Sequence, residues 1–267
     1  MIAMSPQGSV KIPRVVTEFA AGRQTRAVWK NELGGLTFQV GTDDARQFVK
    51  WTPAGSGIDL SAEVTRLRWA GRFVAVPRVL DVGADETGSW IITAGLPGRT
   101  AVDDHWKRDP ATAVRAIGGG LRALHEALVV ADCPFDWSAP TRLQAVRSRA
   151  AAGRIDPADW HHDLRPVGDV DRALELLADI PPVDKLVVCH GDACAPNTLV
   201  GDDGTCTGHV DLGELGVADR WADLAIATWS TQWNYGPGWE EPLLRAYGVE
   251  PDLKRIMYYR LLWELSG

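Results

Sequence analysis

The chain has 267 residues and a formal net charge of −7 at pH 7, so it is long enough for one large domain or two lobes around a packed core. The acidic balance argues against broad nucleic-acid binding, and no stretch approaches the ~18 to 20 uncharged apolar residues of a membrane span. Residues 1–11 lack the positive and apolar regions of a secretory signal, so we expect a cytoplasmic protein. The four cysteines show no CxxC spacing, which argues against zinc and disulfide-exchange chemistry.

Residues 14–51 are predicted to form short strands separated by turns, among them Gly34-Gly35 and Asp43-Asp44. The Gly pair would let backbone amides approach a bound nucleotide, although any hairpin can use such a pair. Two more strands follow and complete an N-terminal sheet. The expected strands are residues 27–29, 36–40, 47–51, 76–82 and 89–93.

Lys50 interrupts one of these apolar strands, where an ammonium group is costly unless it is paired. Glu63 lies within residues 60–69, whose apolar spacing predicts a helix. A strand Lys paired with a helix Glu can place the α- and β-phosphates of a nucleotide. We therefore predict this nucleotide role for the pair, against the alternative of a surface Lys and a solvated Glu.

Helical spacing dominates the second half of the chain. Residues 111–127 form a predicted helix despite three glycines at 118–120, each of which costs roughly 1 kcal/mol relative to Ala. Close packing against another helix is expected to compensate for this cost. Residues 156–163 are expected to open a loop or a further helix. The other predicted helices are residues 141–153, 171–178 and 253–265.

Twelve tryptophans are unusual for a chain of this length. Four of them, Trp229, Trp233, Trp239 and Trp263, gather in the C-terminal fifth of the sequence. Large aromatic side chains of this kind pack in a core or wall a substrate cleft. The sequence leaves both interpretations open.

Two short segments carry the strongest chemical signal. An apolar run ends in His190-Gly191-Asp192 with Asn197 shortly beyond, and a second run ends in Asp211-Leu212-Gly213. Each alone is commonly a helix cap or a turn. Together they offer one carboxylate to orient a hydroxyl nucleophile, and an Asn with a second carboxylate to hold Mg²⁺. Phosphoryl transfer depends mainly on positioning and charge neutralisation, so this set predicts a phosphoryl-transfer site.

This ordered set resembles the catalytic and metal-binding segments of the aminoglycoside phosphotransferases, which are relatives of the protein kinases. The tract 187–223 is similar to the 3'- and 3''-phosphotransferase branch in particular. The resemblance implies an α+β, two-lobed protein-kinase-like fold. Its N-terminal lobe would be an antiparallel β-sheet with one main helix, and its C-terminal lobe mainly helical. ATP and Mg²⁺ are the implied cofactors.

The resemblance also implies where each part of the machinery lies. Residues 1–95 would form the nucleotide-binding lobe and residues 96–267 the catalytic and substrate-binding lobe. At the hinge between them, backbone groups of Ala94 and Leu96 would meet an adenine edge. Asp192 would be the catalytic residue, Asn197 and Asp211 the Mg²⁺ ligands, and Lys50, braced by Glu63, the phosphate anchor.

Two other matches concern structural support. The segment 219–223, Asp-Arg-Trp-Ala-Asp, resembles a family segment in which Asp and Arg stabilise the catalytic loop. His125 is similar to another family landmark, and we interpret it as a structural histidine with its hydrogen bonds satisfied.

The substrate segments depart from the family pattern. In the 3'-enzymes the stretch corresponding to 156–163 is rich in acids that hold ammonium groups, but here His161 and His162 separate Asp159 from Asp163. No acid occurs at 229–233, and the C-terminal helix keeps Glu264 while Trp263 replaces a second acid. The candidates for gripping a substrate cation are Asp159, Asp163 and Glu264.

The predicted reaction is transfer of the ATP γ-phosphoryl group to a hydroxyl of an aminoglycoside antibiotic. The acid-poor segments favour the 3''-hydroxyl of streptomycin. Alternatives are a 3'-phosphotransferase acting on kanamycin or neomycin, a small-metabolite kinase, and a kinase-like nucleotide-binding module without catalysis. We expect a monomer whose partners are the aminoglycoside and a nucleotide, with no nucleic acid or membrane; ATP and GTP are not distinguished.

Overall fold

The computed structural model of the chain describes residues 10–31, 33–42 and 45–266. The expected turn at Asp43-Asp44 and the N-terminal residues 1–9 lie outside this part. In its first half the helices and strands are α1 (Arg14–Ala20), β1 (Thr25–Lys30), β2 (Leu36–Val40), β3 (Gln47–Pro53), α2 (Ser61–Ala70), β4 (Val79–Asp85), β5 (Gly88–Ala94), β6 (Arg99–Thr100), α3 (Asp104–Lys107) and α4 (Pro110–Ala127). In its second half they are α5 (Ala139–Ala151), α6 (Val170–Ala178), β7 (Leu186–Cys189), β8 (Thr198–Val200), β9 (Cys206–His209), β10 (Gly216–Asp219), α7 (Trp221–Tyr235), α8 (Glu240–Tyr247) and α9 (Leu253–Ser266).

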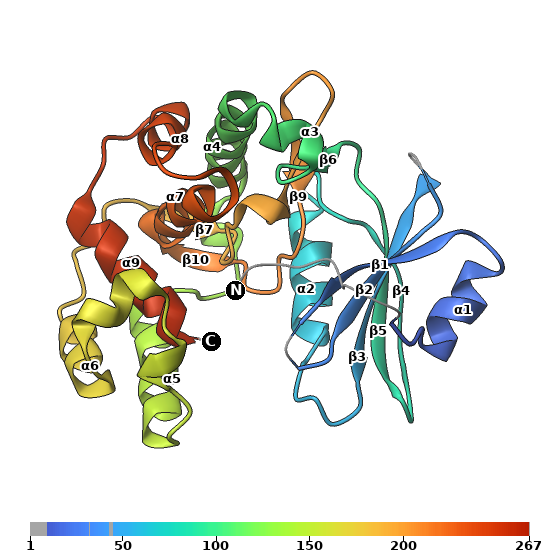
Figure 1. The fold of residues 1–267 in the computed structure, drawn as a ribbon, viewed down its shortest axis with the longest axis horizontal. Coiled ribbons are helices and arrows are strands. Elements are labelled where there is room, and N and C mark those ends of the chain that lie inside the picture. The colour runs from blue at the N-terminus through green and yellow to red at the C-terminus, as the bar shows by residue number, and fades with distance from the viewer. Residues whose placement is uncertain (1–9, 32, 43–44, 267) are drawn as a thin grey trace.

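An antiparallel sheet occupies one side of the molecule, and the main helices occupy the other (Figure 1). Within the described residues the sheet has five strands in the order β1-β2-β3-β5-β4. The five predicted strands are therefore confirmed, although β4 begins at Val79 rather than at residue 76. Pro77 lies just before that start, and proline cannot donate a ladder hydrogen bond.

Side chains alternate between the two faces of the sheet, and this alternation places Lys50. Its neighbour Val49 packs in a core with Val16 of α1. Lys50 therefore points to the opposite face, where its strand partner Ile91 packs with Val64 of α2.

Residues 14–20 form a helix, so the prediction of strands over this segment is wrong. Pro13 occupies the N-cap position, and its ring presets the backbone at a helix start. Val16 and Ala20 lie one helical turn apart and are both buried against the sheet. This short segment is therefore helical because its apolar side chains pack against the sheet.

Helix α2 connects the two parts of the molecule because it packs on both. Val64 faces the sheet, whereas Leu67 and Ala70 belong to the large core of the helical part. In Figure 1 this helix lies between the sheet and the helical part. Its position is therefore fixed from two sides.

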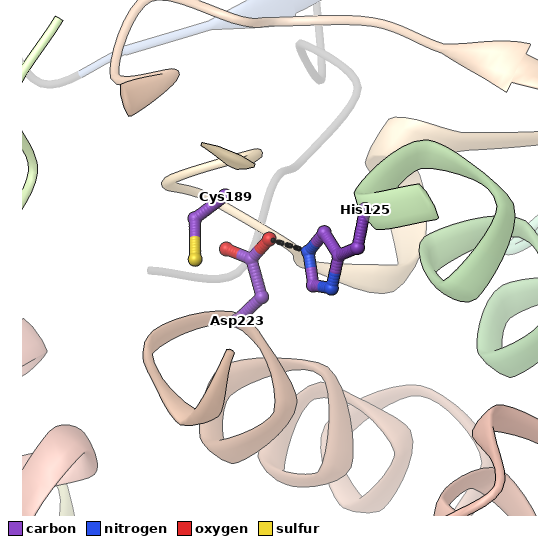
Figure 2. A group of neighbouring side chains, drawn as sticks. All are labelled: His125, Cys189 and Asp223. Carbon is purple, nitrogen blue, oxygen red and sulfur yellow. Dashed lines mark hydrogen bonds and ion pairs between the residues drawn. The ribbon is translucent and has the colours of Figure 1, made fainter. Parts of the chain in front are cut away.

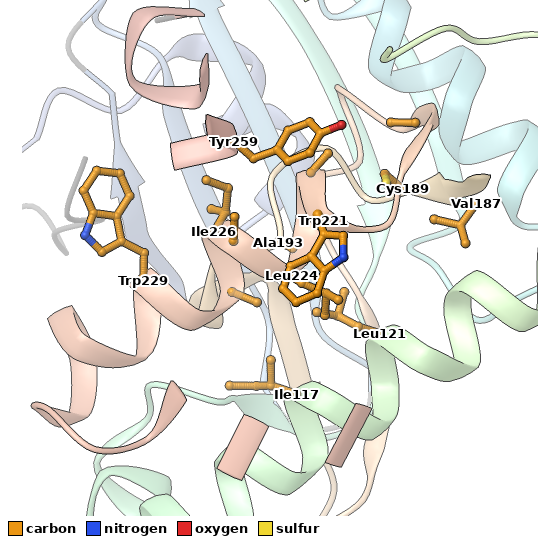
Figure 3. Packing of buried hydrophobic residues seen from close by; sticks show 14 of the residues in the cluster. Ile117, Leu121, Val187, Cys189, Ala193, Trp221, Leu224, Ile226, Trp229 and Tyr259 are labelled. Carbon is orange, nitrogen blue, oxygen red and sulfur yellow. The ribbon is translucent and has the colours of Figure 1, made fainter. Parts of the chain in front are cut away.

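The helical part is built around α7, which is buried from Trp221 to Thr231. Figure 3 shows Leu224 and Ile226 of this helix among Ile117 and Leu121 of α4. Helix α7 also packs on α9, and α4 packs on α8. None of the helices in the described ranges is both long and apolar enough to cross a lipid bilayer.

Two of the three glycines in α4 allow the close packing that the sequence predicts. A Cβ added at Gly118 would lie 2.5 Å from the carbonyl oxygen of Leu243 in α8. One added at Gly120 would lie 2.6 Å from the sulfur of Cys206 in β9. Gly119 has open space instead, so only its flanking glycines are required by packing.

We predict opposite effects for two adjacent substitutions in α4. Gly118→Ala should lower the free energy of unfolding by about 1 to 3 kcal/mol, because its methyl group overlaps α8. Gly119→Ala should raise it by about 0.5 to 1 kcal/mol, since Ala orders the helix at no steric cost. Urea titration of both variants measures the difference; equal effects of one sign would contradict the described packing of α4 on α8.

Candidate active site

The turn His190-Gly191-Asp192 follows β7 and requires its glycine. Gly191 has φ = 90°, in the left-handed region that favours glycine. A Cβ at this position would overlap the carbonyl oxygen of Glu214. The first motif therefore lies directly against the segment that follows Asp211, so the two predicted motifs meet in space.

Asp223 of α7 holds this turn in place. Its carboxylate accepts hydrogen bonds from the N–H groups of His190 (2.6 Å) and Gly191 (2.9 Å). The third partner is Nε2 of His125, 2.9 Å away (Figure 2). Burial acts to raise the pKa of Asp223, but the hydrogen bond and charge of His125 outweigh it, so the pKa lies below its usual value.

His125, Cys189 and Asp223 form a buried group whose residue types could bind a metal. Their polar atoms are already engaged within the protein. The second ring nitrogen of His125 is 2.8 Å from the Tyr247 hydroxyl, and the Cys189 thiol donates to a backbone carbonyl. Burial also raises the pKa of Cys189 well above its usual value, which keeps the thiol protonated. The group supports the turn, and His125 is a structural histidine as expected.

Within the described ranges, one carboxylate oxygen of Asp192 accepts no hydrogen bond from the protein. Asn197 Nδ2 donates to the other oxygen, Oδ2 (3.0 Å), and to the Asp192 carbonyl (2.9 Å). Oδ1 is buried, and no donor within the described ranges reaches it. Burial, and then the negative charge of Asp211, raise the pKa of Asp192. A buried acceptor with a raised pKa is the chemistry of a general base.

Asp211 is tied to the same centre through the backbone. The N–H of Val210 donates to the carbonyl of Asn197 (2.9 Å), and Nε2 of His190 lies 3.0 Å from the Val210 carbonyl. Asp211 itself has φ = 63°, an uncommon conformation for a residue other than glycine. Such strain persists where the surrounding contacts fix the backbone, and it commonly marks a functional position.

Lys50 joins the sheet to this centre. Its Nζ lies 2.7 Å from Glu63 Oε2 and 2.7 Å from Asp211 Oδ1. Burial acts to lower the pKa of Lys50, but the carboxylates of Asp211 and Glu63 together raise it above its usual value. The predicted pairing with Glu63 is thus present, and the second pairing, with Asp211, was not foreseen.

The expected hinge groups are partly occupied by the protein. The N–H of Ala94 donates to the carbonyl of Arg78 (2.9 Å), and the Leu96 carbonyl accepts from the guanidinium of Arg46. Neither of these two groups is open to an adenine edge. The predicted contact between Leu96 and an adenine edge would therefore have to be made by the N–H of Leu96.

The predicted substrate acids differ in their surroundings. Glu264 accepts the N–H of His161 (2.7 Å), and burial raises its pKa. Asp163 accepts from Nε1 of Trp229 (2.9 Å). Asp159 is exposed in a 3₁₀ turn, Pro157–Asp159, and in the described part of the chain it makes no hydrogen bond or ion pair with the other two acids. The structure therefore groups Asp163 and Glu264 around His161 and leaves Asp159 apart.

Similarity to known proteins agrees with this geometry. The phosphotransferase enzyme family matches residues 31–259, which is most of the chain. The aminoglycoside 3'-phosphotransferase of Streptomyces fradiae is 38% identical over 226 residues, covering 79% of this chain and 81% of that protein. The chain belongs to the aminoglycoside phosphotransferase family.

Two further similar proteins are named as enzymes of the 3''-branch. The streptomycin 3''-kinase of Streptomyces griseus is 32% identical to this phosphotransferase over 254 residues, covering 90% of this chain and 92% of that protein. The aminoglycoside phosphotransferase APH(3'')-Id of Streptomyces rimosus, solved with ADP and streptomycin, matches it with a TM-score of 0.69 and 26% identity. That match covers 95% of this chain and 97% of the solved one, and it confirms the predicted two-lobed, kinase-like fold.

The residues present fit a magnesium ion. Asn197 uses its Nδ2 on Asp192, so its Oδ1 is left without a donor in the part of the chain that the structure describes. Asp211 uses Oδ1 on Lys50, and its side chain is 41% exposed. An amide oxygen and a carboxylate are hard ligands of the kind that Mg²⁺ prefers.

Within the segment 219–223 of the phosphotransferase, the acid that supports the catalytic loop is Asp223. Asp219 accepts from the backbone N–H groups of Asp184 (3.0 Å) and Trp221 (3.2 Å), and Arg220 pairs with the Asp184 carboxylate at 2.6 Å. Among the described residues, no side-chain hydrogen bond joins Asp219 or Arg220 to the His-Gly-Asp turn, which Asp223 supports. The signal that could have identified Asp223 is a lone acid within the apolar run of α7, where an unpaired carboxylate would be costly.

We predict that Asp223→Ala lowers the free energy of unfolding by about 3 kcal/mol, because three buried donors lose their acceptor. The pKa of Asp223 is lowered in the folded protein, so its contribution is complete above the usual Asp pKa and disappears as the pH falls through the folded value. Thermal unfolding at neutral and acidic pH measures both effects.

The matched control is Glu126→Ala, which removes only an exposed pair with Arg122 beside His125. This control should leave the melting temperature nearly unchanged. An Asp223→Ala protein as stable as the control at neutral pH would refute the proposed support of the turn.

Proposed function

We propose that this phosphotransferase transfers the γ-phosphoryl group of ATP to a hydroxyl of an aminoglycoside antibiotic and so inactivates it. The observation that carries the proposal is the free, buried Oδ1 of Asp192 beside Asn197, Asp211 and Lys50. The names of the relatives support the acceptor class: a 3'-phosphotransferase, a streptomycin 3''-kinase, and a structure solved with ADP and streptomycin.

In the proposed mechanism Asp192 acts as the general base. Its Oδ1 accepts the proton of the acceptor hydroxyl while that oxygen attacks the γ-phosphorus, and the bond from this phosphorus to the β–γ bridging oxygen breaks, so that ADP leaves. The raised pKa of Asp192 makes it a better proton acceptor than an ordinary carboxylate. Asn197 keeps the carboxylate oriented, because its amide fixes the opposite oxygen.

The other residues bind the nucleotide in this proposal. Lys50, braced by Glu63, pairs with the α- and β-phosphates. Asn197 and Asp211 would hold Mg²⁺, which supplies charge neutralisation on the phosphates when it is bound. Backbone groups near Ala94 and Leu96 would bind the adenine, with the boundary between the nucleotide-binding and substrate-binding parts near residue 95.

For the acceptor we propose streptomycin and its 3''-hydroxyl, with Asp163 and Glu264, and Asp159 at the periphery, near its cationic groups. The absence of acids at 229–233 supports this choice. The 38% identity to a 3'-phosphotransferase favours the second candidate, the 3'-hydroxyl of kanamycin or neomycin. We propose that the enzyme acts as a monomer in the cytoplasm, where ATP is available.

A coupled assay of ADP release tests the proposal over streptomycin, kanamycin, neomycin and hygromycin. We expect release that depends on one of these acceptors, with a product heavier by one phosphate whose position is then determined. Release with none of them, together with intact ATP binding, would favour the nucleotide-binding module without catalysis.

Asp192→Ala should reduce kcat by at least about a hundredfold, because a positioned general base contributes roughly 10² to 10⁴ in rate. ATP binding, measured by calorimetry, should remain. Asp203→Ala, in the exposed turn between β8 and β9, serves as the control and should keep full activity. Unchanged turnover in Asp192→Ala would remove the proposed mechanism.

A further inference from the structure

Four aromatic rings from separate parts of the chain meet beside the substrate acids. Trp229 and Trp233 of α7 have ring centroids 5.0 Å apart, and Trp263 of α9 lies 6.0 Å from Trp233. The ring of His161 lies 4.6 Å from Trp229 and 5.7 Å from Trp233. We call these four residues the aromatic wall.

The rear of the aromatic wall is fixed by hydrogen bonds and charge. Trp229 is fully buried, donates its Nε1 hydrogen to Asp163, and has the guanidinium of Arg260 over its ring at 5.4 Å. A carboxylate oxygen of Glu240 lies 2.9 Å from the guanidinium of Arg260 and balances its positive charge. Trp233, Trp263 and His161 are only half-buried, so part of each ring is accessible to a ligand.

The aromatic wall lies next to the catalytic loop. The Oγ of Ser230, between Trp229 and Trp233 on α7, accepts the N–H of Ala195 at 2.9 Å. Trp233 follows Ser230 by about one helical turn, or roughly 5 Å along the helix. A small oligosaccharide whose hydroxyl lies at Asp192 is therefore long enough to reach the aromatic wall with its other end.

The carboxylates near the aromatic wall already accept hydrogen bonds from other groups of the protein. Glu264 holds the N–H of His161, and Asp163 holds Trp229 and lies 3.1 Å from His162 Nε2. The stretch Trp229-Ser230-Thr231-Gln232-Trp233 carries no charge. Burial lowers the pKa of His161, more than the charge of Asp163 raises it, so its ring is neutral at pH 7 and does not repel a cation.

An uncharged aromatic surface discriminates between kinds of cation. A guanidinium group is planar, weakly hydrated and stacks on aromatic faces, whereas an ammonium group is compact and strongly hydrated. The protein itself stacks a guanidinium, that of Arg260, over the buried ring of Trp229 at the rear of the aromatic wall. An ammonium group loses more hydration here, since the two carboxylates described beside the aromatic wall, Asp163 and Glu264, each already accept a hydrogen bond from the protein.

We propose that the aromatic wall selects a guanidinium-bearing aminoglycoside over one that carries only ammonium groups, with Trp233 and Trp263 as the residues that determine specificity. The inference rests on the proposed aminoglycoside kinase activity and assigns its substrate subclass. Streptomycin, with two guanidinium groups, belongs to the favoured class, and kanamycin, with ammonium groups alone, to the disfavoured class.

The test compares kcat and KM for streptomycin and kanamycin in Trp233→Leu and Trp263→Leu. The KM for streptomycin should rise about tenfold in each variant, as expected for the loss of a cation–π contact. The KM for kanamycin and both kcat values should change less than about twofold. If kanamycin is not turned over, its inhibition constant against streptomycin replaces its KM.

Trp233→Phe and Trp263→Phe are the conservative variants and should retain most of the preference, since each keeps an aromatic face. Trp90→Leu, at a half-buried tryptophan of β5 outside the aromatic wall, controls for general loss of a large side chain. Circular dichroism checks folding; if Trp233→Leu does not fold, Trp263→Leu alone decides the test.

A streptomycin-to-kanamycin preference unchanged in the folded leucine variants would overturn the inference and leave the kinase activity standing. Wild-type protein that phosphorylates neither these nor other aminoglycosides would instead overturn the proposed function, and the inference with it. The two failures are therefore distinguishable in one set of assays.

Discussion

The ammonium group of Lys50 is shared between Glu63 and Asp211, and the arrangement of the whole site depends on this sharing. One contact joins β3 to α2, and the other joins the sheet to the segment after β9. A half-buried Lys between two carboxylates has one stable position, because either carboxylate left unpaired there would be costly. Since α2 also packs on both cores, the Lys50 contacts and the apolar contacts fix the same relative placement of sheet and helices.

Much of this site was predictable because its residues carry local signals. A charge within an apolar strand needs a partner, and that argument leads to Lys50 and Glu63. The paired motifs around Asp192 and Asp211 are recognisable from their order and spacing. Other features have no such signal: α1 is a helix because Val16 and Ala20 meet the sheet, and Arg220 finds Asp184 36 residues away. The Lys50–Asp211 contact spans 161 residues and follows only from the assembled fold.

The substrate side shows why residue type alone was insufficient there. Asp163 and Glu264 were predicted from their charge, but in the fold each carboxylate also accepts a hydrogen bond from the protein. Burial raises the pKa of Glu264 above its usual value, more than the hydrogen bond from His161 lowers it. Of the tryptophans that the sequence left between core and cleft, Trp229 is buried, while Trp233 and Trp263 are half-buried beside it. This arrangement is the basis of our proposal that recognition on this side depends more on aromatic faces than on charge pairs.

The central claim is that Asp192, Asn197 and Asp211 serve one reaction centre that takes a divalent ion and a nucleotide. Crystals grown with ADP and Mn²⁺ in place of Mg²⁺ test it most directly through the anomalous scattering of manganese. We predict an anomalous peak with Asn197 and Asp211 among its ligands, beside the phosphates. A peak only elsewhere, for example at the cluster of His161, His162 and Asp163, or nucleotide bound with no peak at Asp211, would contradict the account.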